Sequence, residues 1–450
     1  MALTRALALQ VLLKGHRSRA YPDQILREML DRYPDLSLRD RALVYQLVLG
    51  VLRWQGKIDW IIRQVSLRPL EKLSLKTLTI LRLGVFQLFF LSRIPPSAAV
   101  NESVNLAKNG EEWSTGFING VLRSILRRKE TFPFPGPEDP IPYLAVNYSH
   151  PVWLVEEWLR IWGFEKTREF CQANLEIPPA TLRVNTLKIG RDVLFPKLRR
   201  LASQTEATAY SPEGVRMISP LKPLQQTEFF KEGLFQIQDE ASQLISFILD
   251  PRPGERILDL CAGFGGKASH LAQLMKNRGI IRAVDHNPRK LKDLMKNVHR
   301  LGISIIQGWV GEAAGEDLFP KDSPPFDRIL LDAPCTGWGV IRRNPDLKWR
   351  LRAEDSPRLA DRQNKFLQKA AKWLKSKGVL VYATCTLSPT ENEHVVARFL
   401  KDHRDFSLED VSPFLPGKAK GLADGKGFYR TWPALHGTDG FFAARLIKSG

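Results

Sequence analysis

The sequence predicts a multidomain protein with an all-α N-terminal region, a small α+β middle module and a C-terminal α/β domain built on a doubly wound parallel sheet. Three observations point to this class. Apolar residues recur at helical spacing over residues 1–130, five prolines fall between Pro133 and Pro142, and strands alternate with helices from about residue 236 onward. We therefore expect three domains, at residues 1–132, 143–235 and 236–450.

The N-terminal region is expected to be helical throughout. Segments such as ALALQVLL, QILREML and LVYQLVLGVLRW place apolar residues on one helix face, and Gly50 and Gly56 are expected to interrupt the pattern. The segment FINGVLRSILRR (117–128) ends the region with a basic helix face. The prolines that follow stop helix and strand alike, so we interpret them as a linker.

The middle module mixes helix and strand. The segment VWLVEEWLRIWG is typical of an amphipathic helix, which we expect to end at Gly163. The segment PPATLRVNTLK predicts a strand that is entered from Pro178 and Pro179.

The C-terminal region alternates strands and helices, which favours a parallel, doubly wound sheet. A glycine-rich turn joins the first strand to a helix, and the helix RQNKFLQKAAKWLKSKG is expected to end at Gly378. The tail GFYRTWPALHGTDGFFAARLIK is interpreted as a hairpin near the sheet edge. The predicted strands are RILDLC (256–261), IIRAVD (280–285), SIIQG (304–308), RILLDAP (328–334) and VLVYATC (379–385).

The charge favours a polyanionic partner. The chain holds 67 Lys and Arg against 48 Asp and Glu, a net charge of +19, and residues 1–130 contribute about half of that excess. For a chain with no membrane segment we interpret this balance as a sign of nucleic-acid binding.

The four cysteines are too few and too scattered for a disulfide framework, and the absence of a C-x-x-C pair argues against a zinc site. We therefore expect no metal and a reducing, cytoplasmic setting.

The most apolar segment, residues 77–91, contains Arg82 and is too short to span a bilayer. The apolar N-terminus lacks a small-residue cleavage site, so we expect an amphipathic helix there and no signal peptide. No coiled-coil pattern is visible, and we expect a monomer.

The glycine-rich turn Cys261-Ala262-Gly263-Phe264-Gly265-Gly266-Lys267 can bring backbone N–H groups close to a ligand at the start of a helix. Asp285 ends the next strand about twenty residues later, where a carboxylate can hold ribose hydroxyls. The turn is not the dinucleotide pattern G-x-G-x-x-G, and it has no Walker lysine. The pattern therefore favours a nucleoside ligand without pyrophosphate.

Two cysteines follow two predicted strands, Cys335 in FDRILLDAPCTGWGV and Cys385 in GVLVYATCTLSPTENE. A single free cysteine is most often a buried packing residue. Two of them at the carboxyl ends of strands, where open sheets bind ligands, predict one site with two sulfurs. Thr390 and Glu393 fit a capping box that would open the next helix and fix the loop after Cys385.

The two motifs DAPCTGWG and ATCTLSPTENE together resemble those of the Nop/Sun-type RNA cytosine-C5 methyltransferases. The turn CAGFGGKASHLA is similar to that family's cofactor loop, and QIQDEASQL and HGTDGFF resemble further family segments. The helical region resembles a NusB-like RNA-binding domain. The combination is similar to the bacterial members that act on small-subunit ribosomal RNA, and the resemblance spans nearly the whole chain.

The resemblance implies a Rossmann-like class I methyltransferase domain, S-adenosylmethionine as cofactor and a flipped-out cytosine of ribosomal RNA as substrate. By similarity Cys385 would attack C6 of the base, Asp332 would stabilise the protonated N3, Cys335 would assist proton removal and product release, and Lys267 would orient the site. The implied cofactor-binding residues are Cys261, Ala262, Gly263, Phe264, Gly265, Gly266, Lys267, Asp285, Glu312, Asp332 and Pro334.

The sequence departs from the family pattern in the cofactor region. Gly263 and Phe264 stand where the loop usually has Ala and Pro, and Ala268 stands in place of Thr. After the third strand, either Trp309 stacks on the adenine or Glu312 supplies the usual carboxylate.

Two alternatives stay open. The departures in the cofactor region would also fit an RNA-binding ribosome-assembly protein with a decayed cofactor site. In addition, Pro334-Cys335 has the form of the Pro-Cys dipeptide from which DNA cytosine methyltransferases attack, so Cys335 could be the nucleophile in place of Cys385.

Overall fold

The computed structural model describes residues 2–18, 22–313, 315, 318–320 and 322–450. The chain forms two compact units. One unit consists of Met1–Ile177 together with Ile341–Ala353, and the other of Pro178–Val340 together with Glu354–Gly450. In the part of the chain that is described, no helix is both long and apolar enough to cross a membrane.

The first unit is built from helices, as the sequence predicts for residues 1–130. It also includes residues 131–177, where a linker and the start of the small module were expected, and Pro140 and Pro142 lie inside a helix. Its core is contiguous and is formed mainly by apolar side chains of α1, α3, α4 and α6. The helices are α1 (Ala2–Arg17), α2 (Pro22–Leu30), α3 (Leu38–Arg63), α4 (Leu75–Phe90), α5 (Pro96–Ala107), α6 (Thr115–Arg127), α7 (Pro140–Asn147), α8 (Val152–Ala173) and the short α14 (Leu347–Arg350).

The predicted interruption at Gly50 and Gly56 is wrong, because α3 runs through both positions. Gly50 is a packing residue. A Cβ atom there would lie 2.0 Å from the ring of Phe86 on α4, so glycine allows the two helices to approach closely. Gly163 does break helix geometry, with a φ of 75°, but α8 resumes after it and ends only at Ala173.

Residues 341–353 belong to the first unit although they follow directly on the Cys335 motif in the sequence. The Nζ atom of Lys348 donates a 2.9 Å hydrogen bond to the carbonyl oxygen of Arg53, and the indole nitrogen of Trp349 donates one of 2.6 Å to that of Leu52. Burial lowers the pKa of Lys348 well below its usual value. No local pattern in the sequence indicates this association.

The second unit begins with a small antiparallel sheet in the order β2-β3-β1-β4, accompanied by α9 and α10. The predicted strand in PPATLRVNTLK is β1, and its Leu182 and Val184 face the core of this module. The elements are β1 (Ala180–Val184), α9 (Arg191–Leu198), β2 (Ala202–Ala207), β3 (Gly214–Pro220), α10 (Glu228–Lys231) and β4 (Phe235–Ile237).

The rest of the unit is an eight-stranded sheet in the order β10-β12-β9-β8-β5-β6-β7, with β11 paired to β12. The five strands from β9 to the edge strand β7 are parallel, as predicted, and β12 runs antiparallel to both β9 and β10. The strands are β5 (Arg256–Leu260), β6 (Ile280–Asp285), β7 (Ile306–Val310), β8 (Phe326–Asp332), β9 (Leu374–Thr384), β10 (Phe406–Glu409), β11 (Tyr429–Thr431) and β12 (Phe441–Lys448).

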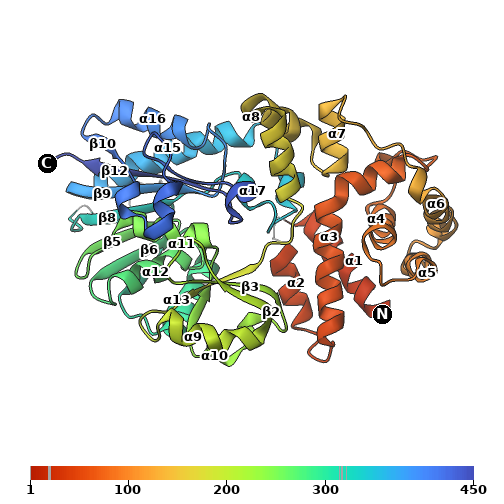
Figure 1. Cartoon of the computed structure of the whole chain (residues 1–450), viewed down its shortest axis with the longest axis horizontal. Helices are drawn as coiled ribbons and strands as arrows, with labels where there is room; N and C mark the ends of the chain where they lie inside the picture. Colours follow the sequence, from red (N-terminus) through yellow and green to blue (C-terminus); the bar gives the residue numbers. More distant parts are fainter. Residues whose placement is uncertain (1, 19–21, 314, 316–317, 321) are drawn as a thin grey trace. The chain divides into compact units, whose positions relative to one another are not determined.

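Helices cover both faces of this sheet (Figure 1). One face packs against α11 (Glu240–Leu249), α12 (Gly266–Leu274) and α13 (Pro288–Leu301), and the other against α15 (Asp355–Trp373) and α16 (Glu393–Asp402). The chain order reverses between β5 and β8, so a crevice for ligands is expected at the carboxyl ends of these neighbouring strands.

The tail forms the predicted hairpin near the sheet edge, because β11 pairs with β12 and β12 lies next to the edge strand β10. Two local predictions need correction. The segment before Gly378 is not helical, because α15 ends at Trp373 and β9 begins at Leu374. The helix α16 has Asn392 as its N-cap, without a side-chain capping bond, so the capping box of Thr390 and Glu393 does not form.

Candidate functional site

The two predicted thiols meet at the carboxyl ends of neighbouring parallel strands. Cys335 follows β8 by three residues, and Cys385 directly follows β9. Their sulfur atoms lie 3.4 Å apart, and both side chains are partly exposed. The sequence prediction that the two sulfurs share one site therefore agrees with the geometry.

The two thiols are coupled through their contact. The hydrogen bond with Cys385 raises the pKa of the Cys335 thiol well above its usual value, and burial adds to the effect. Either sulfur can be the donor in this contact. The charge on one sulfur therefore affects how readily the other loses its proton.

A buried carboxyl that sequence reasoning missed connects the two cysteine loops. Glu391 accepts hydrogen bonds from the backbone N–H of Thr336 at 3.0 Å, from its hydroxyl at 2.5 Å and from Gln363 at 3.0 Å. The hydroxyls of Thr336 and Thr386 lie 2.8 Å apart, which adds a direct link between the residues that follow the two cysteines. The only sequence signal was the T-E-N-E run, which fitted a helix cap equally well.

The lysine of the glycine-rich turn pairs with the strand-end aspartate. Lys267 lies in the first turn of α12, and its Nζ atom is 2.6 Å from a carboxylate oxygen of Asp332 at the end of β8. The lysine is nearly buried, and its Nζ also lies 5.0 Å from the centre of the Phe441 ring. The pair joins the start of α12 to the strand that precedes Cys335.

The turn itself has an irregular backbone. Cys261, Gly263 and Gly265 all have positive φ angles, and a Cβ atom on Gly265 would lie 2.6 Å from Leu294. The N–H of Gly263 donates a 3.0 Å hydrogen bond to the nearly buried carboxylate of Asp285 at the end of β6. Asp285 therefore fixes the turn and keeps lone pairs for further partners.

The third thiol at this edge is of a different kind. Burial raises the pKa of Cys261 strongly, and the nearby carboxylates of Asp332 and Asp285 raise it further. A thiol in such surroundings stays protonated, so Cys261 is a packing residue of the turn and a poor nucleophile.

A hollow of about 280 Å³ lies beyond the end of β7 and is lined by Trp309, Val310, Gly311, Glu312, Gly315 and Leu318. Trp309 and Glu312, which the sequence left as alternatives for contacting an adenine, border the same space. The Glu312 carboxylate is also 2.7 Å from Arg362. An aromatic face and a carboxylate beside one hollow are suited to a nucleobase and its amino group.

The residues present fit a nucleoside that carries a positive charge. Backbone N–H groups of the turn, the Asp285 and Asp332 carboxylates and the hollow at Trp309 lie along one edge of the sheet. The fully buried Asp259 of β5 lies behind them, and burial raises the pKa of its carboxyl to about 8, with Asp332 contributing. Among the described residues, no group of His, Cys, Asp and Glu is placed to hold a metal ion.

Three family models match successive parts of the chain. Residues 246–447 match the model of the 16S rRNA methyltransferase RsmB/F family, residues 2–127 that of the NusB family, and residues 150–223 that of a ferredoxin-like domain of RsmF/B-like methyltransferases. The small antiparallel sheet of the second unit thus belongs in part to a known module.

Curated relatives cover nearly the whole chain. The probable ribosomal RNA small subunit methyltransferase B of Bacillus subtilis is 37% identical over 99% of both chains. The ribosomal RNA small subunit methyltransferase B of Pseudomonas syringae pv. tomato is 34% identical over 99% of this chain and 96% of its own length.

Solved structures agree with the fold. The crystal structure of PH0851 has a TM-score of 0.84 at 29% identity and covers 99% of this chain and 98% of its own. The structure of NSun6 from Pyrococcus horikoshii with SFG has a TM-score of 0.59 at 26% identity and covers 67% of this chain and 98% of its own.

Proposed function

We propose, on the premise that this chain belongs to the 16S rRNA methyltransferase RsmB/F family, that it methylates C5 of a cytosine in small-subunit ribosomal RNA with S-adenosylmethionine as methyl donor. The observation that carries the proposal is the pair of sulfur atoms 3.4 Å apart at the ends of β8 and β9. Methylation at a ring nitrogen or at a ribose hydroxyl needs no thiol, whereas methylation at an unreactive ring carbon does.

The chemistry requires a nucleophile because C5 of cytosine is not nucleophilic by itself. Addition of the Cys385 thiolate to C6 forms a carbon–sulfur bond and moves the ring electrons toward C5 and N3. Asp332 would hold the proton at N3, and Lys267, 2.6 Å from it, would keep that carboxyl in place. When bound, S-adenosylmethionine supplies an electrophilic methyl group on a sulfonium, which becomes a neutral thioether as the methyl leaves.

The coupled thiols suggest how the second half of the reaction is timed. The hydrogen bond with Cys385 is the first cause of the raised pKa of Cys335. Once the Cys385 sulfur is bonded to C6 it carries no negative charge, so it no longer opposes ionisation of Cys335. Cys335 can then release its proton to solvent and, as a thiolate, take the proton from C5. The electrons of the C5–H bond restore the C5–C6 double bond as the C6–S bond breaks, so Cys385 leaves as a thiolate, and the N3 proton returns to Asp332.

The cofactor would be held by chain segments that already meet at this edge. The turn 261–266 would present its N–H groups, Asp285 the ribose contact, and Trp309 and Glu312 the adenine contact. Phe264 of this turn is 57% exposed, and the Nζ atom of Lys290 lies 6.0 Å from the centre of its ring.

The basic helical region, residues 1–132, and the small module, residues 143–235, would supply the RNA contacts, with the methyltransferase domain at 236–450. The net charge of +19 supports binding to the phosphate backbone, and a monomer in the cytoplasm is the expected state. A base that reacts at C5 and C6 must leave its stack, which favours an unpaired nucleotide as the target.

The direct test is to incubate the full chain with methyl-labelled S-adenosylmethionine and unmodified small-subunit RNA. Nucleoside mass spectrometry should find the label in 5-methylcytidine at one position, and the Cys385→Ala variant should give none. Calorimetric titration with S-adenosylmethionine distinguishes a methyltransferase from the alternative, an RNA-binding ribosome-assembly protein with a decayed cofactor site. Absence of saturable cofactor binding, together with tight RNA binding, would favour a ribosome-assembly protein.

A further inference from the structure

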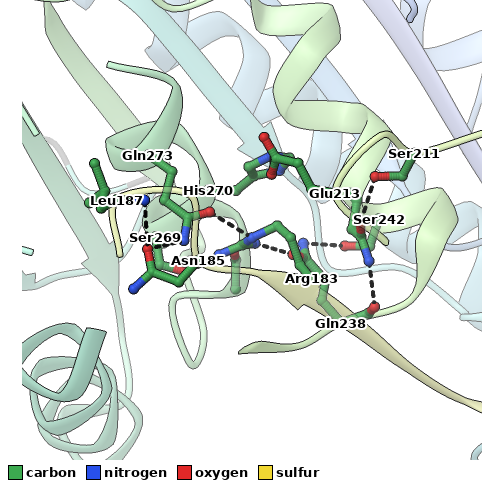
Figure 2. Close-up of polar contacts among 12 residues, drawn as sticks. Arg183, Asn185, Leu187, Ser211, Glu213, Gln238, Ser242, Ser269, His270 and Gln273 are labelled. Atoms are coloured by element: carbon green, nitrogen blue, oxygen red, sulfur yellow. Dashed lines mark hydrogen bonds and ion pairs between the residues drawn. The ribbon is translucent and has the colours of Figure 1, made fainter. Parts of the chain in front are cut away.

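A fully buried arginine of the small module reaches the start of α12, the helix that follows the glycine-rich turn. The Arg183 guanidinium on β1 donates hydrogen bonds to the carbonyl oxygen of Gly266 at 2.7 Å, to the hydroxyl of Ser269 at 2.8 Å and to the side-chain oxygen of Gln273 at 3.0 Å. It also donates to Gln238, and Figure 2 shows Arg183 beside Gln238, Ser269 and Gln273.

The three acceptors on α12 lie on one face of the helix. Gly266, Ser269 and Gln273 are spaced three and four residues apart, which is the spacing of neighbours on a helix surface. Asn185, two residues after the arginine, accepts a 2.8 Å hydrogen bond from Gln273. The LRVN segment of the small module therefore contacts a stripe of α12 that ends at the glycine-rich turn.

This arrangement is costly to maintain if its purpose is stability alone. Arg183 has no exposed surface, and burial lowers the pKa of its guanidinium to about 9. Its four acceptors on the protein are neutral oxygens, and the Glu213 carboxylate favours the charge electrostatically but is not one of the bonded acceptors, so the cost of burying the charge is only partly offset. What an arginine offers beyond an apolar residue is a rigid fork that fixes several acceptors at once.

One of the fixed atoms, the carbonyl oxygen of Gly266, borders the candidate site. Gly266 is the last residue of the turn proposed to hold the cofactor, and its carbonyl is bonded to Arg183 at one end of the peptide that leads into Lys267. Lys267 in turn lies 2.6 Å from Asp332. A displacement of the Gly266 carbonyl would move both the turn and the lysine.

We propose that Arg183 is a positioning residue for the cofactor turn, through which the small module sets the affinity of the site for a nucleoside sulfonium. This inference rests on the proposed function, because it takes residues 261–266 as the cofactor site. Arg183 touches neither the reacting base nor the methyl donor. It acts through the backbone of Gly266 and the face of α12.

The test compares full-length variants by calorimetric titration with S-adenosylmethionine and with S-adenosylhomocysteine. Arg183→Met should weaken binding of both by about ten- to a hundred-fold, since it removes charge-assisted hydrogen bonds that fix the turn. Arg183→Lys keeps the positive charge, but all of its N–H donors are on one nitrogen atom and cannot reach several acceptors as the guanidinium does. Its affinity for S-adenosylmethionine should therefore be higher than that of Arg183→Met and about ten-fold weaker than that of the original chain. In turnover assays the KM for S-adenosylmethionine should rise while the KM for RNA stays unchanged.

The matched control is Arg445→Met. Arg445 is another buried arginine, and it donates to the backbone carbonyls of Ile248 and Leu249, away from the turn. This variant should lose thermal stability as Arg183→Met does, but its affinity for S-adenosylmethionine should change by less than about three-fold.

Either of two results would overturn the inference. One is folded Arg183→Lys protein that binds S-adenosylmethionine as tightly as the original chain, which decides the question even where Arg183→Met does not fold. The other is an equal loss of affinity in Arg445→Met. Failure of the original chain itself to bind S-adenosylmethionine would instead contradict the proposed function, so the two failures are distinguishable.

Discussion

Two polar clusters of the second unit use their hydrogen-bonding capacity in opposite ways. Cys335 and Cys385 are partly exposed, and the contact between their sulfur atoms is 3.4 Å long. Arg183 is fully buried and its guanidinium is bonded to four acceptors. A group that must form a new covalent bond needs accessible lone pairs, whereas a group that fixes a backbone benefits from being fully bonded.

Two further residues of the second unit show the transition from one kind to the other. Glu391 behind the thiols is fully buried and accepts three hydrogen bonds, so it resembles the arginine cluster in its bonding. Asp332 has one ion pair, with Lys267, and is about a third exposed. The proposed reacting groups therefore lie at the exposed end of this series, and the supporting groups lie at the buried end.

The largest expected effect comes from Cys385→Ala. If Cys385 attacks C6, methyl transfer should fall by at least about a thousand-fold, because the addition step loses its nucleophile. Single-turnover assays with labelled S-adenosylmethionine measure this loss. Cys171→Ala is the matched control, since Cys171 is fully buried in the first unit, burial raises its pKa, and its removal should leave the rate within about three-fold.

Cys335→Ala should produce a different defect of similar or smaller size. Addition to C6 can still occur, but removal of the C5 proton is slowed, so a covalent protein–RNA adduct should accumulate. Denaturing gel electrophoresis after incubation with RNA and S-adenosylmethionine detects the adduct as a shifted band. A shifted band with Cys385→Ala and none with Cys335→Ala would exchange the two roles and support attack from Pro334-Cys335.

The arrangement of the strand ends could be predicted because it depends on local patterns. Strand-helix alternation places the ends of parallel strands at one edge, so two cysteines after two strands had to come close. The helical character of the first unit followed from apolar spacing in the same way. Both predictions are confirmed by the structure.

What could not be predicted depends on partners far away in the sequence. Gly50 interrupts an apolar pattern but continues α3, because its partner Phe86 lies 36 residues later. Glu391 looks like part of a helix cap until the loop of Thr336, 55 residues earlier, packs against it. In the sequence Arg183 is one polar residue in a predicted strand. Its proposed positioning role depends on the contact with Gly266, 83 residues later, which no local pattern predicts.

The smallest expected effect concerns Asp259, which is fully buried beside the Lys267–Asp332 pair. Its pKa of about 8 lies above its ordinary value of 3.8, so between these pH values the folded chain holds a proton that the unfolded chain has released. The free energy of unfolding should therefore fall as pH rises from about 4 to about 8.

Asp259→Asn does not titrate and should escape this loss. Thermal unfolding should show the variant melting about 5 °C higher than the original chain at pH 9, with the difference vanishing near pH 4. The exposed Asp293→Asn should show no such pH-dependent difference, and a gain for Asp259→Asn that is equal at both pH values would mean that the carboxyl is already ionised in the folded protein.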